Sequence, residues 1–221
     1  MAITRAADNA QWQASADALV AVDARLRAYA ERFGPPRPRL GRESAFVSLS
    51  RSIVFQQLHG AAASRIWQRV AETVGSPLSP SAFLRVSDGA FRCAGLSRHK
   101  LASIRDLATR VDEKKLTLRS LSRRNDEEII EELTAVRGIG RWTAEMFLLF
   151  HLRRKDVWPV TDYGVRKGFA RLSGLADMPA ARALQHAADR YRPHRSALTW
   201  YLWQVASALP ASLADAETSQ G

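Results

Sequence analysis

The stretch LTAVRGIGRWTAEMF (133–147) has the residue types of an anion-binding turn. Its two glycines, Gly138 and Gly140, permit positive φ angles and let another backbone come close. They precede a predicted helix that starts at Arg141, so the turn would direct bare N–H groups and the positive end of that helix at a phosphate. Arg137 and Arg141 on the two flanks favour the same ligand. The alternative is an ordinary turn between two helices that is closed by a glycine cap.

The charge of the chain agrees with a polyanionic partner. Lysine and arginine number 33 against 22 aspartates and glutamates, which gives a formal net charge of +11. Such an excess attracts nucleic acid, although a solvated basic surface without a specific partner would carry the same charge. No apolar stretch reaches the ~20 residues of a membrane span, and the N-terminus has no secretory signal. We therefore expect a protein of the cytoplasm, associated with the nucleoid if the cell is bacterial.

The residues that commonly bind metals give no pattern. Cys93 is the single cysteine, which excludes an internal disulfide and a zinc or iron–sulfur site built from cysteines. We expect its side chain to be small, apolar and buried. The five histidines are scattered, so the sequence predicts no metal site and no required cofactor.

The hydrophobic periodicity is helical almost everywhere, which predicts an all-α fold. A proline-rich linker is expected at 34–40, a short helix within 76–86, an extended segment at 156–162 and a frayed tail at 213–221. The other expected elements are helices at 15–34, 44–60, 61–75, 98–111, 126–133, 141–152, 163–172, 179–190 and 194–208. Ser15, Ser97 and Asn125 are the expected N-caps.

Four segments in order carry a resemblance to a known family. The stretch 133–147 resembles the helix-hairpin-helix motif of the DNA glycosylase superfamily (HhH-GPD) that shares the fold of endonuclease III. The segments IVFQQLHGAAASRI (53–66), CAGLSRHKLASIRDLA (93–108) and YRPHRSALTWYLWQ (191–204) resemble that superfamily's 3-methyladenine DNA glycosylase II branch. The resemblance covers about 42–207 and rests on this order as much as on the glycine pair.

The resemblance implies a fold and a division of the chain. We expect a compact bilobal helical bundle whose active site lies in the cleft between the lobes, with 1–221 forming one catalytic unit. One lobe would span about 44–152 and contain the helix-hairpin-helix. The other would combine about 1–43 with 160–212. A monomer is expected.

Asp162 corresponds to the family's essential aspartate, 20 residues after Trp142. Cutting a base from deoxyribose builds positive charge on the sugar, which a carboxylate can stabilise while it orients the attacking water. Taken alone, Asp162 is equally an N-cap of the helix that follows it, and both roles are compatible. Family members that also cut the strand have a lysine where this chain has Trp142. The resemblance therefore implies the single-function branch, in which water is the nucleophile.

The base pocket and the DNA-binding residues follow from the same resemblance. Trp142, Tyr163 and Trp158 would offer aromatic walls for a cationic alkylated purine, with His194 where related proteins often have a tryptophan. Gln57 would fill the gap left by the flipped base, Leu58 would wedge and His59 would enter the minor groove, unless 56–59 is only a helix end with a buried leucine. The residues expected to grip the DNA backbone are Arg137, Gly138, Ile139, Gly140, Arg141 and Thr143.

The expected substrate is double-stranded DNA that contains damaged bases such as 3-methyladenine or 7-methylguanine. The hairpin carbonyls are expected to suit a structural Na⁺ or K⁺ ion, as seen in the family. Two alternatives remain open. One is a non-catalytic duplex-binding module in which Asp162 only caps a helix, and the other is a bifunctional glycosylase for oxidised bases.

Overall fold

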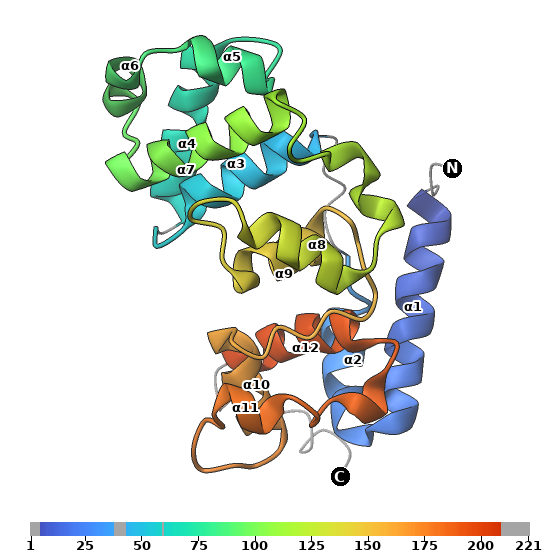
Figure 1. The fold of residues 1–221 in the computed structure, drawn as a ribbon. Coiled ribbons are helices and arrows are strands. Elements are labelled where there is room, and N and C mark those ends of the chain that lie inside the picture. Colours follow the sequence, from blue (N-terminus) through green and yellow to red (C-terminus); the bar gives the residue numbers. More distant parts are fainter. Residues whose placement is uncertain (1–4, 38–42, 59, 209–221) are drawn as a thin grey trace. The chain divides into compact units, whose positions relative to one another are not determined.

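The computed structural model describes residues 5–37, 43–58 and 60–208, and every regular element in these ranges is a helix (Figure 1). The all-α prediction is therefore confirmed. The chain forms two compact units, one made of Met1–Arg39 with Arg153–Gly221 and the other of Leu40–Leu152. We call them the terminal unit and the central unit. None of the helices in the described ranges combines the length and apolar character needed to cross a membrane.

The central unit is organised around α7 (Arg98–Asp112), which packs against α3, α5 and α6. Phe83 forms its aromatic core, with Phe46 edge-on at 5.2 Å and Phe91 stacked at 5.8 Å between ring centroids. The hairpin helices α8 and α9 pack on each other, and α9 also contacts α3. The remaining helices of this unit are α3 (Ala45–Phe55), α4 (Gly60–Val74), α5 (Pro80–Arg85), α6 (Asp88–Cys93), η2 (Leu118–Arg123), α8 (Asp126–Thr134) and α9 (Arg141–Phe150).

Side-chain caps decide where these helices begin. Each capping oxygen accepts the backbone N–H three residues along, which satisfies one of the bare donors at a helix start. Ser97 does so for Lys100, and Asn125 forms a reciprocal capping box with Glu128. The helices predicted at 98–111 and 126–133 are confirmed to within one residue.

The terminal unit is built on the close contact of α10 (Tyr163–Leu172) with α12 (Arg195–Ser207). A Cβ on Gly168 would lie 2.1 Å from the carbonyl oxygen of Leu202, so only glycine lets the two helices come this close. The helices α1 and α2 pack on α12 and complete the core. The other helices of this unit are α1 (Arg5–Val22), η1 (Ala24–Leu26), α2 (Arg27–Phe33), α11 (Ala181–Leu184) and η3 (Asp189–Tyr191).

The single helix predicted at 15–34 is wrong. Ser15 lies within α1, and the chain breaks at Asp23, which caps η1. Asp23 also accepts the hydroxyl of Tyr191 at 2.6 Å and a nitrogen of Arg190 at 2.9 Å. The hydrogen bonds from Arg25 hold the pKa of the Asp23 carboxyl well below its usual range. Asp23 thus joins the start of η1 to a segment distant in the sequence, while Gly34 ends α2 as predicted, at φ +67.

Three further expectations need correction. The helix predicted at 179–190 contains only α11 and η3, and the helix predicted at 44–60 ends at Phe55. Cys93, the last residue of α6, is exposed rather than buried. The linker expected at 34–40 is described only as far as residue 37, where it is not helical, and the tail at 213–221 lies outside the described residues.

Lys155 is an unusual buried cation in the terminal unit. Its Nζ lies 3.3 Å from the centroid of the Trp12 ring and 3.7 Å from the Asp8 carboxylate, and it makes no hydrogen bond within the described residues. Asp8 has a second partner, Arg153, at 2.9 Å. Burial lowers the pKa of Lys155 to about 8, so the folded protein loses this proton at a lower pH than the unfolded chain does.

We expect Lys155→Met to raise the free energy of unfolding at pH 7 by about 1–2 kcal/mol, because it removes a buried charge without an acceptor and leaves Asp8 paired. The unfolded lysine keeps its proton up to its ordinary pKa of 10.5. Wild-type stability therefore rises between pH 8 and that value, and the advantage of the variant shrinks. Denaturant unfolding at pH 7 and pH 9.5 measures this, with the exposed Lys115→Met as the control. A gap that widens with pH would contradict it.

Candidate catalytic carboxylate and nucleic-acid interface

Asp162 is a buried carboxylate at the start of α10. It is 8% exposed, and its Oδ1 accepts the backbone N–H of Val165 at 2.8 Å. The same oxygen accepts the indole N–H of Trp203 at 2.8 Å. The N-cap that the sequence allowed is therefore present, and a second donor from α12 fixes the carboxylate further.

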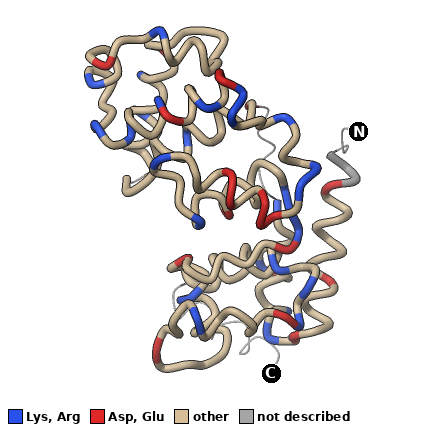
Figure 2. The backbone as a smooth tube through the Cα atoms, in the orientation of Figure 1, with Lys and Arg blue, Asp and Glu red and all other residues tan. Residues whose placement is uncertain are grey.

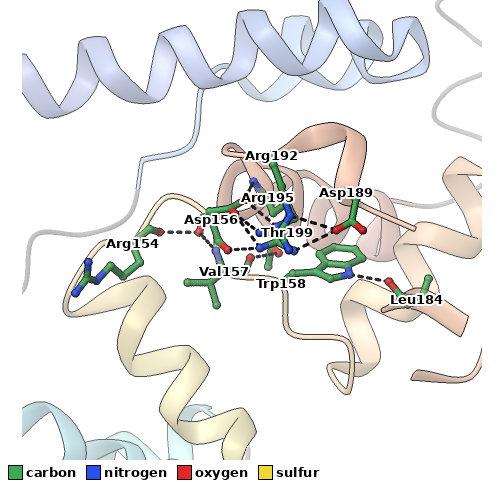
Figure 3. A network of polar contacts seen from close by, with 10 residues as sticks. Arg154, Asp156, Val157, Trp158, Leu184, Asp189, Arg192, Arg195 and Thr199 are labelled. Carbon is green, nitrogen blue, oxygen red and sulfur yellow. Dashed lines mark hydrogen bonds and ion pairs between the residues drawn. The ribbon is translucent and has the colours of Figure 1, made fainter. Parts of the chain in front are cut away.

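The segment before Asp162 is held by the start of α12 (Figure 3). Arg195 pairs with Asp156 through two contacts of 2.8 Å, from Nε to Oδ1 and from Nη2 to Oδ2. The hydroxyl of Ser196 accepts the N–H of Val157 at 3.0 Å and donates to the carbonyl of Arg154 at 2.6 Å. The segment is extended but belongs to no β-sheet, so its backbone groups have no sheet hydrogen bonds. The bonds to Arg195 and Ser196 take their place, and the chain reaches Asp162 in a defined conformation.

Two of the expected base-pocket residues have structural contacts in the terminal unit. Trp158 is 8% exposed, belongs to the core cluster and donates its indole N–H to the Leu184 carbonyl at 2.9 Å. Its assignment as a pocket wall is corrected, because a ring packed in the core cannot stack on a base. His194 is half-buried at the N-cap of α12, with its Nδ1 3.1 Å from the Ser15 hydroxyl.

The other two aromatic residues are accessible. Tyr163 directly follows Asp162 and is 65% exposed, and Trp142 at the second position of α9 is 43% exposed. An exposed aromatic face is able to stack on a ligand.

Gly138 is required by the packing of the hairpin itself. It has φ +76, and a Cβ there would lie 2.2 Å from the Ser103 hydroxyl on α7. Its carbonyl accepts the side-chain amide of Gln56 at 3.0 Å, and the amide of Arg137 donates to Asp106 on α7 at 2.8 Å. The side chain of Ile139 packs inward and is 3% exposed, so only the backbone of this residue can contact DNA. The turn is thus fixed on three sides by the central unit.

Packing within the protein does not require glycine at position 140. Its φ of −91 suits any residue, and a Cβ there would meet nothing within 4 Å. Within the described ranges, the amides of Gly138 and Gly140 donate to no protein acceptor. The bare backbone at Gly140 therefore lies at a helix start with its donors available, which is the geometry that binds a phosphate.

Two hairpin residues that were expected to contact DNA are bound to other protein groups instead. The guanidinium of Arg141 pairs with Glu127 at 2.5 and 2.9 Å and with Glu145 at 3.1 Å. These bonds raise the pKa of Arg141 and lower that of Glu127. Arg141 is therefore engaged across the hairpin, where α8 concentrates acidic residues (Figure 2). Thr143 is 5% exposed, and its hydroxyl accepts the amide of Gln56 at 3.2 Å.

The segment after α3 has the exposure expected of a wedge. Gln57 is exposed with φ +55, and Leu58 is 39% exposed instead of buried. A non-glycine residue at such a φ is unfavourable and must be held by its surroundings. Here Lys100 donates to the carbonyls of Val54 and Gln56 at 2.7 Å each and so fixes the end of α3. His59 lies outside the described residues.

Comparison with known proteins identifies the family. The sequence profile of the HhH-GPD superfamily of base excision DNA repair proteins matches residues 50–193, which include both the hairpin and Asp162. The chain belongs to this superfamily. The resemblance inferred from the sequence is confirmed.

Related proteins cover nearly the whole fold of this HhH-GPD protein. DNA-3-methyladenine glycosylase 1 of Schizosaccharomyces pombe is 32% identical, over 77% of this chain and 76% of its own. A DNA-3-methyladenine glycosidase structure from Bacillus halodurans is 36% identical with a TM-score of 0.79, covering 91% of both chains. The S. pombe 3-methyladenine DNA glycosylase bound to abasic DNA has a TM-score of 0.78 at 28% identity, covering 88% of this chain and 97% of its own.

Sequence reasoning missed the residues that support the site from a distance. Trp203 reaches Asp162 from 41 residues away, and Gln56 reaches Gly138 from 82 residues away. No local pattern announces such contacts. Among the described residues, no group of three or more His, Cys, Asp or Glu side chains could hold a metal ion.

The two hairpin glycines are expected to respond differently to alanine. Gly138→Ala should cost about 2 kcal/mol or more of stability, because its φ and the Ser103 contact both oppose a Cβ. Gly140→Ala should leave stability within about 0.5 kcal/mol of wild type, yet weaken duplex DNA binding about 10-fold, because the Cβ occupies the space that a phosphate would use. Thermal unfolding and fluorescence anisotropy with undamaged duplex measure both effects. Full DNA affinity in Gly140→Ala would refute the phosphate contact.

Proposed function

We propose that this HhH-GPD protein is a monofunctional DNA glycosylase that removes alkylated purines, such as 3-methyladenine and 7-methylguanine, from double-stranded DNA in base excision repair. The observation that carries the proposal is the buried, doubly hydrogen-bonded carboxylate of Asp162 in a chain of this superfamily. The names of its relatives, DNA-3-methyladenine glycosylases, support the substrate class.

The chemistry that Asp162 can do is electrostatic stabilisation of a cationic sugar. As the N-glycosidic bond lengthens, positive charge grows on the deoxyribose, and a fixed carboxylate lowers the energy of that state. Water then adds its oxygen to the anomeric carbon and gives up a proton, while the cationic alkylated base takes the bonding electron pair and leaves as a neutral molecule. Asp162 can orient this water or accept its proton in passing, as carboxylates do in glycoside hydrolysis. The products are a free base and an abasic site.

The absence of a lysine at position 142 supports a reaction with water alone. A strand-cutting glycosylase needs an amine nucleophile, which attacks the sugar and forms a Schiff base. Trp142 cannot do this, and no lysine occurs anywhere in 133–149. We therefore expect no covalent protein–DNA intermediate.

The accessible aromatic rings support a cationic substrate base. Alkylation at N3 or N7 gives a purine a positive charge and weakens its glycosidic bond, so little protonation of the leaving base is needed. The faces of Trp142 and Tyr163 attract such a cation more than a neutral base. Flipping a base costs a few kcal/mol, least for a damaged one. The exposed Gln57 and Leu58 are suited to filling the gap it leaves.

The remaining parts of the proposal concern the assembly. We propose that 1–221 acts as one catalytic unit, as a monomer, in the cytoplasm, where it associates with the nucleoid if the cell is bacterial. No cofactor is required. A Na⁺ or K⁺ ion on the hairpin carbonyls would stabilise the turn. The carbonyl of Val136 already accepts the amide of Ile139 at 3.1 Å, and its second lone pair suits such a hard cation.

Asp162→Asn is the test of the catalytic role. We expect base release from methylated DNA, followed by chromatography of the freed bases, to fall by about 100-fold or more because the charge is lost. The asparagine oxygen can still accept the Val165 N–H, so stability and duplex binding should stay near wild type. Release of 3-methyladenine at the wild-type rate by this variant would exclude Asp162 as the catalytic group.

The alternatives give different results with the wild-type protein. A duplex-binding module would bind DNA in a salt-dependent way and release no base. A bifunctional glycosylase would yield a protein–DNA adduct with borohydride, together with release of oxidised bases. Either outcome would overturn the proposed reaction.

A further inference from the structure

The indole of Trp203 lies on α12, yet its N–H donates to the carboxylate that begins α10. The distance from Nε1 to Asp162 Oδ1 is 2.8 Å, and the two residues are 41 positions apart. Both belong to the terminal unit. The same Oδ1 is also bound by the Val165 N–H at 2.8 Å, so two donors from different helices meet on one oxygen.

Gly164 makes room for this contact. A Cβ at this position would lie 2.6 Å from Cδ1 and 3.2 Å from Nε1 of Trp203. Gly164 has helical backbone angles that any residue could adopt, so its backbone conformation does not require glycine. Glycine within a helix costs about 1 kcal/mol relative to alanine. The chain accepts this cost where the indole approaches the carboxylate.

Close packing of the two helices does not by itself explain Gly164. The backbone of α12 approaches α10 at Gly168, one turn along, where a Cβ would meet the Leu202 carbonyl. At Gly164 the nearest atoms to such a Cβ are Cδ1 and Nε1 of Trp203 and, at 3.2 Å, Oδ1 of Asp162. Gly164 therefore leaves room at the point where the indole and the carboxylate meet.

We propose that Trp203 is a positioning residue that holds the catalytic carboxylate of Asp162 in its reactive orientation. This inference rests on the proposed glycosylase function. The capping bond to Val165 alone leaves the carboxylate able to turn about its bond to Cβ. A second donor on Oδ1 fixes the plane of the group, so it need not reorganise when the cationic sugar forms. A displacement of about 1 Å at such a group can lower a rate 100-fold.

The test is a double-mutant cycle of Trp203→Phe and Asp162→Asn. We expect Trp203→Phe to lower the single-turnover rate of 3-methyladenine release about 10-fold, with unchanged affinity for undamaged duplex. In the Asp162→Asn background the same change should have no further effect, because there is no charge left to aim. An equal loss in both backgrounds, or no loss in either, would overturn the positioning role.

Trp12→Phe is the matched control. Trp12 is 2% exposed in the core of the same unit, and its indole N–H has no acceptor within the described residues. The substitution loses the same volume without touching Asp162, so we expect the wild-type rate. Gly164→Ala approaches the contact from the other helix and should lower the rate as Trp203→Phe does. It also provides a second variant if Trp203→Phe folds poorly.

The hydrogen bond between Trp203 and Asp162 can also be detected without measuring base release. A failure of this bond can therefore be told apart from a failure of the glycosylase function. Six tryptophans give six indole cross-peaks in a ¹H–¹⁵N NMR spectrum, and Trp203→Phe assigns one of them. We expect that peak to shift in Asp162→Ala and to stay in place in Trp12→Phe. If the wild type released no base but the peak responded, the glycosylase proposal alone would fail. A peak that ignores Asp162→Ala would exclude the contact itself.

Discussion

The terminal unit depends on one buried carboxylate that two helices share. Asp162 begins α10 by accepting the Val165 amide, and it ties α10 to α12 through the Trp203 indole. A buried charge is costly unless it is hydrogen-bonded, so the fold must keep both donors in place. Gly168 meets that demand by letting the backbone of α12 approach, and Gly164 leaves room for the Trp203 indole. The same bonds that stabilise the helix start hold a negative charge in a fixed orientation, which is what a developing sugar cation needs.

The hairpin of the central unit differs from this site, since its Gly138 and Gly140 amides find no acceptor among the described residues. Gly138 is fixed against α7 and Gln56, which sets the turn. Gly140 then presents its backbone amide where none of the described residues supplies an acceptor. Arg141, which the sequence suggested as a phosphate ligand, instead bridges Glu127 and Glu145. Backbone amides can bind a phosphate without reading the base sequence, so repair can act at any site on DNA.

The sequence predicted features that depend on local signals. Ser97, Asn125 and Asp162 cap helices as expected, because a cap needs only residues three positions apart. The break at Asp23 was missed, and one contact of that carboxylate, the hydroxyl of Tyr191, lies 168 residues away. The pairing of Arg141 with Glu127 and the core position of Trp158 depend equally on how the helices pack. Family resemblance supplied Asp162, but only the structure revealed Trp203 beside it.

We expect the Asp162 carboxylate to face the sugar cation in the DNA complex, while backbone amides hold the strand. A crystal structure with duplex DNA that carries a pyrrolidine abasic analogue would show this geometry, since the analogue has a positive charge in the sugar ring. We expect a carboxylate oxygen of Asp162 within about 4 Å of that nitrogen, with the Trp203 bond intact and a phosphate on the Gly140 amide. A carboxylate directed to bulk water, more than about 6 Å from the cation, would contradict the account.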